Sequence, residues 1–254
     1  MQGFVFYNGP SILDGSPIVG IVTGLIHPSP NQKTGPMAQV YFLVADMPPL
    51  QASHAGRDAA ICGSCPLRGR LVKSSSGANK VVERQCYVFL PHGPRQVYDA
   101  WRKGNYPEVG PRDGSRALTR RLVRLGSYGD PACVPYPVLE ALLAKAGDVT
   151  GYTHQWQRFP ELRRWCMASC DTPAERDAAH ALGFRTFRIR RRDEPVLAGE
   201  GICPGSHEMN RALRCSECML CGGESTGTKG DVTIIAHGHG ANYFHRNVPE
   251  TLDA

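Results

Sequence analysis

Cysteine placement constrains this 254-residue chain more than any other feature. Four of its ten cysteines form a late group, in which Cys203 precedes Cys215, Cys218 and Cys221. Two residues between successive thiols allow one short loop to wrap a single ion or cluster. Four thiolates can fill a tetrahedral zinc site or supply one ligand to each iron of a four-iron cluster. The group predicts a metal centre and leaves the metal open; reduced free cysteines are the alternative.

An earlier group consists of Cys62 and Cys65, with Cys86 after twenty further residues. Three cysteines can hold a four-iron cluster and leave one iron open, or His54 or His92 can complete a Cys₃His zinc site. A redox dithiol is a third interpretation. In a fourth, all seven cysteines converge on one region. For Cys133 and Cys166 we expect small core residues, and Cys170 is left open.

The first 25 residues have no basic start or apolar run of an export signal, which predicts a cytoplasmic protein, where structural disulfides are rare. No stretch reaches the roughly 18 apolar residues of a membrane helix. The net charge of +6 favours anionic partners mildly. Two arginine-rich stretches predict either a solvated face or a surface for nucleic acid. They comprise Arg112, Arg116, Arg120, Arg121 and Arg124, then Arg185, Arg188, Arg190, Arg191 and Arg192.

Hydrophobic patterning predicts strands that alternate with helices after about residue 120, which indicates parallel pairing. Before it, a small N-terminal β element is expected in residues 1–50 and a cysteine-containing irregular or helical segment in 51–112. Residues 113–254 would form an α/β region, either a partial (β/α) barrel or an open parallel sheet with cysteine-rich metal-binding insertions. The expected strands are 4–7, 17–25, 39–45, 122–127, 148–153, 164–169, 184–189 and 232–236, and the expected helices are 93–101, 135–146 and 172–183.

Polar residues recur where these strands end, and in such folds chemistry gathers at the carboxyl ends. Asp130, His154 and Asp171 are the predicted catalytic residues, as acid, base or nucleophile. The alternative is structural: a turn at Asp130, a helix start at Asp171 and a polar rim at His154. Further residues at these ends are Ser127, Tyr128 and Gly129, predicted to bind a cofactor, and His237 and His239, which either ligate metal or end the last strand.

Several motifs carry a resemblance to known proteins. They are Tyr7-Asn-Gly-Pro-Ser11, Cys62-Gly-Ser-Cys65-Pro66, Arg124-Leu-Gly-Ser-Tyr-Gly-Asp-Pro131, Gly151-Tyr-Thr-His-Gln-Trp156 and Ala168-Ser-Cys-Asp-Thr172. With the late cysteine group, they resemble a family of cysteine-rich proteins encoded by bacteriophages. The layout is more distantly similar to radical S-adenosylmethionine enzymes, which have an early three-cysteine group, a partial barrel and a late auxiliary cluster. Their early cysteines are usually separated by three and then two residues, not two and twenty.

The resemblance implies an iron–sulfur enzyme, radical-SAM-like, that modifies a nucleotide or a nucleic-acid base in the cytoplasm of the bacterial host. S-adenosylmethionine is then an implied cofactor. A similarity to base-exchanging transglycosylases implies instead a Zn²⁺ enzyme that uses Asp130 and Asp171 for base exchange or hydrolysis. A third hypothesis is a non-catalytic, zinc-stabilised protein that binds a host protein or nucleic acid through its arginine-rich surface.

Overall fold

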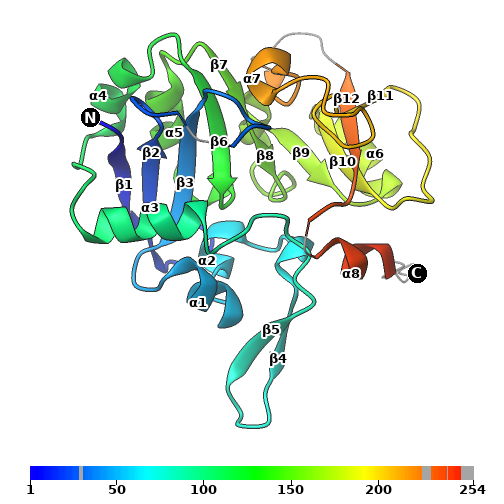
Figure 1. Ribbon diagram of the computed structural model, residues 1–254, viewed down its shortest axis with the longest axis horizontal. Helices are drawn as coiled ribbons and strands as arrows, with labels where there is room; N and C mark the ends of the chain where they lie inside the picture. Colours follow the sequence, from blue (N-terminus) through cyan, green and yellow to red (C-terminus); the bar gives the residue numbers. More distant parts are fainter. Residues whose placement is uncertain (29–30, 225–229, 239, 247–254) are drawn as a thin grey trace.

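The computed structural model describes residues 1–28, 31–224, 230–238 and 240–246. Two five-stranded sheets, in the orders β1-β2-β3-β6-β7 and β11-β12-β10-β9-β8, form the body, and β4-β5 forms a separate hairpin (Figure 1). The strands are β1 Phe4–Pro10, β2 Pro17–Thr23, β3 Ala38–Val44, β4 Arg70–Lys73, β5 Asn79–Val82, β6 Leu122–Tyr128, β7 Asp148–Thr150, β8 Tyr152–Thr153, β9 Met167–Cys170, β10 Thr186–Arg190, β11 Glu200–Ile202 and β12 Asp231–Ile235.

The first three strands pair antiparallel, as the sequence predicts. These three strands are not a separate sheet, because β3 also pairs in parallel with β6 and so joins them to the main sheet. Their side chains supply much of the largest apolar core, in which Phe4, Ile18 and Phe42 are fully buried.

A single residue, Gly151, separates β7 from β8 and joins the two sheets. β7 pairs in parallel with β6, whereas β8 pairs in parallel with β9. β9, β10, β12 and β11 then continue in parallel. The predicted α/β fold with parallel strands is confirmed. In the described residues β1 and β11 each have one sheet neighbour, so the arrangement is open.

Helices cover both sides of this framework. α1 and α3 contact β3, and α6 packs on β9 and β10. The predicted start of α6 is confirmed: the Thr172 hydroxyl accepts the Glu175 N–H at 3.2 Å, and the Glu175 carboxylate accepts the Thr172 N–H. The helices are α1 Pro49–His54, α2 Ala59–Cys62, α3 Gly93–Arg102, α4 Pro111–Ala117, α5 Tyr136–Leu143, α6 Pro173–Ala181, α7 Cys215–Cys218 and α8 Ala241–Arg246, with 3₁₀ turns η1 Pro66–Arg68, η2 Pro131–Cys133 and η3 Pro160–Arg164.

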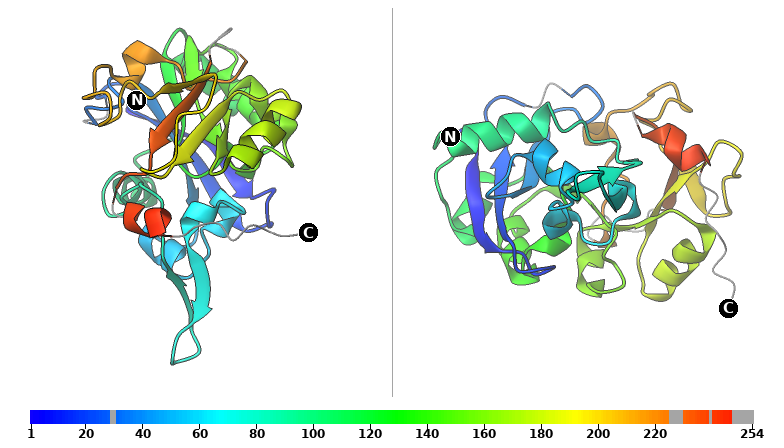
Figure 2. Two further views of the ribbon diagram at one scale, coloured as in Figure 1. Left: turned by 90° about the vertical axis from the view of Figure 1, so that its right-hand side faces the viewer. Right: turned by 90° about the horizontal axis from the view of Figure 1, so that it is seen from below.

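Several strands differ from the sequence prediction. The strand expected at 164–169 begins later, because η3 occupies residues 160–164 and β9 starts at Met167. β11 was not predicted, since its three residues carry little apolar signal. The β4-β5 hairpin lies in the segment expected to be irregular or helical and projects from the body in two views (Figures 1 and 2).

Candidate functional site

One cavity of about 270 Å³ lies against the inner face of both sheets. Alternate residues of β6, β10 and β12 line it, as the period of two in a β-strand requires. On β10 these are Phe187 and Ile189, and on β12 they are Val232 and Ile234. All seven cysteines of the early and late groups also line it: Cys62, Cys65, Cys86, Cys203, Cys215, Cys218 and Cys221. The interpretation in which they converge on one region is therefore the one that the structure shows.

A tight turn positions the first two early cysteines. Cys62 ends α2, and Gly63 follows with a φ of 55°. A Cβ at Gly63 would lie 2.6 Å from the Gln155 side chain, so only glycine fits. The Arg68 guanidinium closes the turn, since it donates to the Gly63 carbonyl at 2.8 Å and to the buried Asp58 carboxylate at 2.7 Å.

Backbone hydrogen bonds bring in the remaining early and late cysteines. The Cys86 N–H donates to the Leu67 carbonyl at 2.8 Å, beside the turn that carries Cys65. Cys203 follows β11, and its N–H donates to the Thr233 carbonyl of β12. Cys215 starts α7, and its N–H donates to the Lys33 carbonyl.

The thiols of each group lie close enough to influence one another's charge. Burial raises the pKa of Cys62, and the neighbouring Asp58, Cys65 and Cys86 raise it further. Burial likewise raises the pKa of Cys221 to about 12, with the other three late cysteines contributing in the same direction. Thiolates gathered in this way repel one another unless a cation offsets their charge.

No three His, Cys, Asp or Glu side chains within the described residues are arranged to hold a metal ion. The cysteine-rich metal-binding insertions predicted from the sequence are thus not confirmed. The donor set nevertheless fits a thiolate-bound centre in its chemistry, because each group contains Cys-x-x-Cys spacing and all of its cysteines line the same cavity.

Two of the predicted catalytic residues contact each other. His154 Nε2 lies 3.4 Å from Asp171 Oδ2 and 3.9 Å from Cys65 Sγ. Burial opposes protonation of His154, but Cys65 and Asp171 outweigh it and raise the histidine pKa well above its usual value. The same nitrogen contacts both partners, whereas a Cys–His–Asp relay uses both ring nitrogens. His154 lines the cavity, and Asp171 lies behind it.

Asp130 also lines the cavity, yet both of its oxygens accept backbone N–H groups. Oδ1 accepts from Ala132 at 3.0 Å and Oδ2 from His154 at 2.8 Å. Burial raises the Asp130 pKa, and these bonds moderate the rise. The carboxylate thus fixes the turn after β6 and the start of the segment after β8. Its catalytic role stays a prediction.

Of the three predicted cofactor-binding residues, Tyr128 and Gly129 line the cavity. Ser127 is not among the lining residues, and its hydroxyl donates to the Gln39 side chain at 2.6 Å. The reason is the alternation of side chains along β6: Gly126 and Tyr128 line the cavity, and Ser127 between them lies on the other side of the strand. Whether the other two bind a cofactor stays a prediction.

The remaining histidines and cysteines are dispersed. His54 and His92 are exposed and lie outside the cavity lining, so His154 is the histidine beside the early group. His237 lines the cavity and stacks on Tyr87, with the two ring centroids 5.7 Å apart. His239 lies outside the described residues. Cys133, Cys166 and Cys170 are buried and do not line the cavity.

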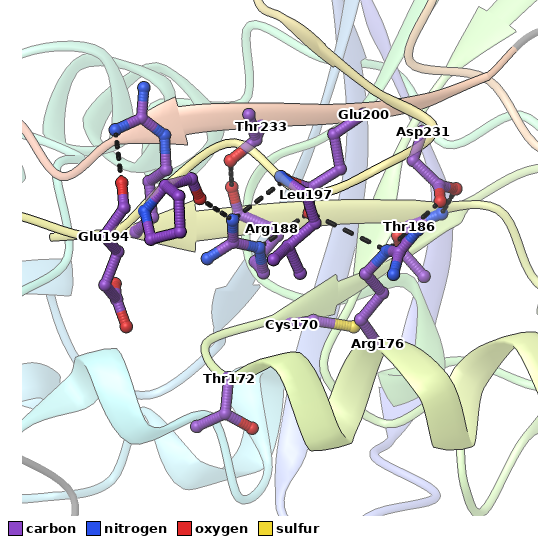
Figure 3. Close-up of polar contacts among 12 residues, drawn as sticks. Cys170, Thr172, Arg176, Thr186, Arg188, Glu194, Leu197, Glu200, Asp231 and Thr233 are labelled. Carbon is purple, nitrogen blue, oxygen red and sulfur yellow. Dashed lines mark hydrogen bonds and ion pairs between the residues drawn. The ribbon is translucent and has the colours of Figure 1, made fainter.

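Two arginines of the second arginine-rich stretch, Arg188 and Arg190, do not belong to a solvated face, whereas Arg192 is exposed. Arg188 is 1% exposed and makes a two-pronged ion pair with Glu200, at 2.6 and 2.8 Å (Figure 3). Arg190 is also buried and pairs with Glu208. Both side chains lie on the β10 face opposite the cavity. They are therefore unavailable to an external nucleic acid.

Sequence reasoning missed the role of Arg124. It counted this residue among the surface arginines, whereas the side chain points from β6 into the cavity. Its Nη2 donates to the Tyr87 hydroxyl at 2.7 Å. The available signal was a single cation inside an otherwise apolar strand, Leu122-Val-Arg-Leu125.

None of the helices among the described residues has the length and apolar character needed to cross a bilayer. Comparison of the chain with protein-family models, curated proteins and solved structures gives no match. Function is therefore inferred from the residues of the cavity.

Proposed function

We propose that the protein is a metal-cluster enzyme that binds its substrate in the cysteine-lined cavity. One observation carries the proposal: seven cysteines, drawn from three separate parts of the chain, line the same cavity at the inner face of parallel strands. Reduced free cysteines are the alternative, but each of these could pack alone as a small apolar side chain and would not require the others beside it. Ligand pockets in α/β sheets commonly lie at the carboxyl ends of the strands.

The two groups would have different roles. Cys62, Cys65 and Cys86 supply three thiolates, which suits a four-iron cluster with one iron left for a substrate or cofactor. Cys203, Cys215, Cys218 and Cys221 supply four, which suits a closed auxiliary or structural centre. When bound, such clusters supply one-electron chemistry. A radical-SAM-like reaction on a nucleotide or nucleic-acid base is the finer form of the proposal, with S-adenosylmethionine as the co-substrate to test.

The protein's own residues would shape and orient the site. His154, between Cys65 and Asp171, would hold or move a proton at Nε2. Tyr152 and Phe187, whose rings lie 4.6 Å apart, form an aromatic wall of the cavity. Such a wall excludes water and suits the face of a base.

The zinc alternative, in which Asp130 and Asp171 perform base exchange or hydrolysis, is less well supported by the geometry. Asp130 is committed to two backbone N–H groups, and Asp171 does not line the cavity. Two free carboxylates facing one substrate are not present in the described residues.

The test is metal and labile-sulfide analysis of protein purified without oxygen. Wild-type protein is expected to contain iron and sulfide. Replacing Cys62 and Cys65 by alanine should remove the iron and sulfide bound by the early group. Replacing Cys215 and Cys218 should remove the iron and sulfide bound by the late group. Cys133→Ala is the control, since this thiol is more deeply buried than those of Cys62, Cys65, Cys215 and Cys218 but lies outside the cavity.

Three results would contradict the cluster proposal. They are protein free of metal, metal content that is unaffected by both double replacements, and stoichiometric zinc without sulfide. The last of these would support the zinc enzyme or the zinc-stabilised binder.

A further inference from the structure

Apart from its thiols, the lining of the cavity carries an excess of positive charge. Lys33, Arg124 and Arg214 line it, whereas Asp130 is the one carboxylate among its described lining residues. Both Asp130 oxygens already accept backbone N–H groups. In the described part of the chain, none of the three cations lies within 4.0 Å of a carboxylate oxygen. A cavity of this kind attracts an anion.

Arg124 is the most deeply placed of these cations. It is half-buried in the middle of β6, and its register partner on β7 is Thr150. Paired residues of neighbouring strands share one face of the sheet, and both residues line the cavity. The guanidinium and the Thr150 hydroxyl are therefore neighbouring donors on one wall.

The Tyr87 hydroxyl fixes the guanidinium from the side. It accepts from Arg124 Nη2 at 2.7 Å, the one hydrogen bond of this guanidinium among the described residues. A guanidinium has five N–H donors, so most of them remain for a partner in the cavity. Burial opposes the charged form, but the tyrosines at 87 and 152 and the thiols at 215 and 221 outweigh it and raise the Arg124 pKa. The side chain is a permanent cation.

We propose that Arg124 and Thr150 bind the oxyanion of a small molecule, a phosphate or a carboxylate, whose flat apolar body lies against Tyr152 and Phe187. The planar fork of arginine matches both anions through two parallel hydrogen bonds. The aromatic pair lies in the same cavity. This inference rests on the proposed function only in taking the cavity as the substrate site, and it requires no metal.

The competing explanation is that Arg124 merely offsets the charge of the nearby Cys215 and Cys221 thiolates. The two explanations predict different losses. A substrate-binding arginine is needed for anion affinity, whereas a counter-ion is needed for metal retention.

The experiment is calorimetric titration of the oxygen-free protein with three probes: nucleoside 5′-monophosphates, the same nucleosides without phosphate, and phenylacetate. We expect an anionic probe to bind wild-type protein more tightly than the uncharged nucleosides. Arg124→Gln should weaken that binding by about ten- to a hundredfold, and Arg124→Lys by less, because it keeps the charge. Arg121→Gln, an exposed arginine three residues away, is the matched control and should bind as wild type does. The anionic probe that binds more tightly identifies whether the oxyanion of the natural ligand is a phosphate or a carboxylate.

Binding that prefers neither anion, or that survives in Arg124→Gln, overturns the proposal. Metal analysis and thermal melting of the same samples separate the remaining cases. Loss of metal in Arg124→Gln with anion binding unchanged identifies a counter-ion and also overturns it. Arg124-dependent anion binding by wild-type protein that lacks metal would support the anion site and contradict the metal-cluster function.

Discussion

The two faces of β10 carry opposite kinds of surface. Toward α6, Arg188 is enclosed by Glu200, which also accepts the Leu197 N–H, and Asp231 accepts the Thr186 N–H (Figure 3). Asp231 also pairs with His180. Toward the cavity, the strand offers only apolar side chains. There, thiols and cations from other elements face one another without a carboxylate ion pair in the described residues.

The difference separates charges that stabilise the fold from charges that await a partner. Buried charges are retained when they are paired and hydrogen-bonded, because desolvation costs several kcal/mol per ion. Every charged group in the network around Arg188 meets that condition. The cations of the cavity do not: Lys33 and Arg124 are half-buried and have no carboxylate partner in the described residues, which is more typical of a ligand site than of a core.

Removing Glu200 should have the largest effect on stability. Glu200→Ala leaves Arg188 buried without its carboxylate, and we expect the free energy of unfolding to fall by about 3–5 kcal/mol. Denaturant unfolding measures the change. In the matched double variant Arg188→Met/Glu200→Leu no charge is left unpaired, so most of the loss should be recovered. A loss below about 1 kcal/mol in the single variant would show that the pair is not structural.

A smaller effect on stability is expected at the start of α6, the helix that packs on β9 and β10. Thr172→Ala removes the hydroxyl that accepts the Glu175 N–H, and N-cap losses of this kind cost about 1 kcal/mol. Thr172→Ser, which keeps the hydroxyl, is the control and should unfold close to wild type. Equal stability of both variants would mean that the helix start depends on packing alone.

The smallest effect on stability should come from the cavity face. Arg124→Met removes a cation with one hydrogen bond and no carboxylate partner in the described residues. The free energy of unfolding should therefore fall by about 0.5 kcal/mol or less, or increase. The same denaturant experiment tests it. A loss above about 2 kcal/mol would place Arg124 with Arg188 among the structural charges and remove the contrast between the two faces.

Local signals predicted much of the fold. The capping residues Thr172 and Glu175, the left-handed Gly183 and the proline at the start of α3 all act within a few residues, and the two helices that they bound lie where the sequence predicts them. The hairpin β4-β5 escaped because its residues are mostly exposed, so no apolar alternation marks it. β11 depends on pairing with β12, thirty residues further on.

The face of a strand on which each side chain lies was easier to predict than whether that face is buried. Alternation in β10 correctly separated Phe187 and Ile189 from Arg188 and Arg190. It gave no indication that the arginine side is buried, because the partners Glu200 and Glu208 lie in later loops and strands. The cavity itself was open to prediction through its cysteines, but the inward direction of Arg124 depends on the strand register.

The junction at Gly151 has a mechanical consequence. Its N–H donates to the Cys221 carbonyl and its carbonyl accepts the Met167 N–H, while a Cβ there would lie 2.9 Å from Cys166 Sγ. The junction between the two sheets is thus tied by its own main chain to the segment that carries the last thiol. A shift of the Cys221 carbonyl would break this hydrogen bond, so the position of the last thiol-bearing segment and the geometry of the junction depend on each other.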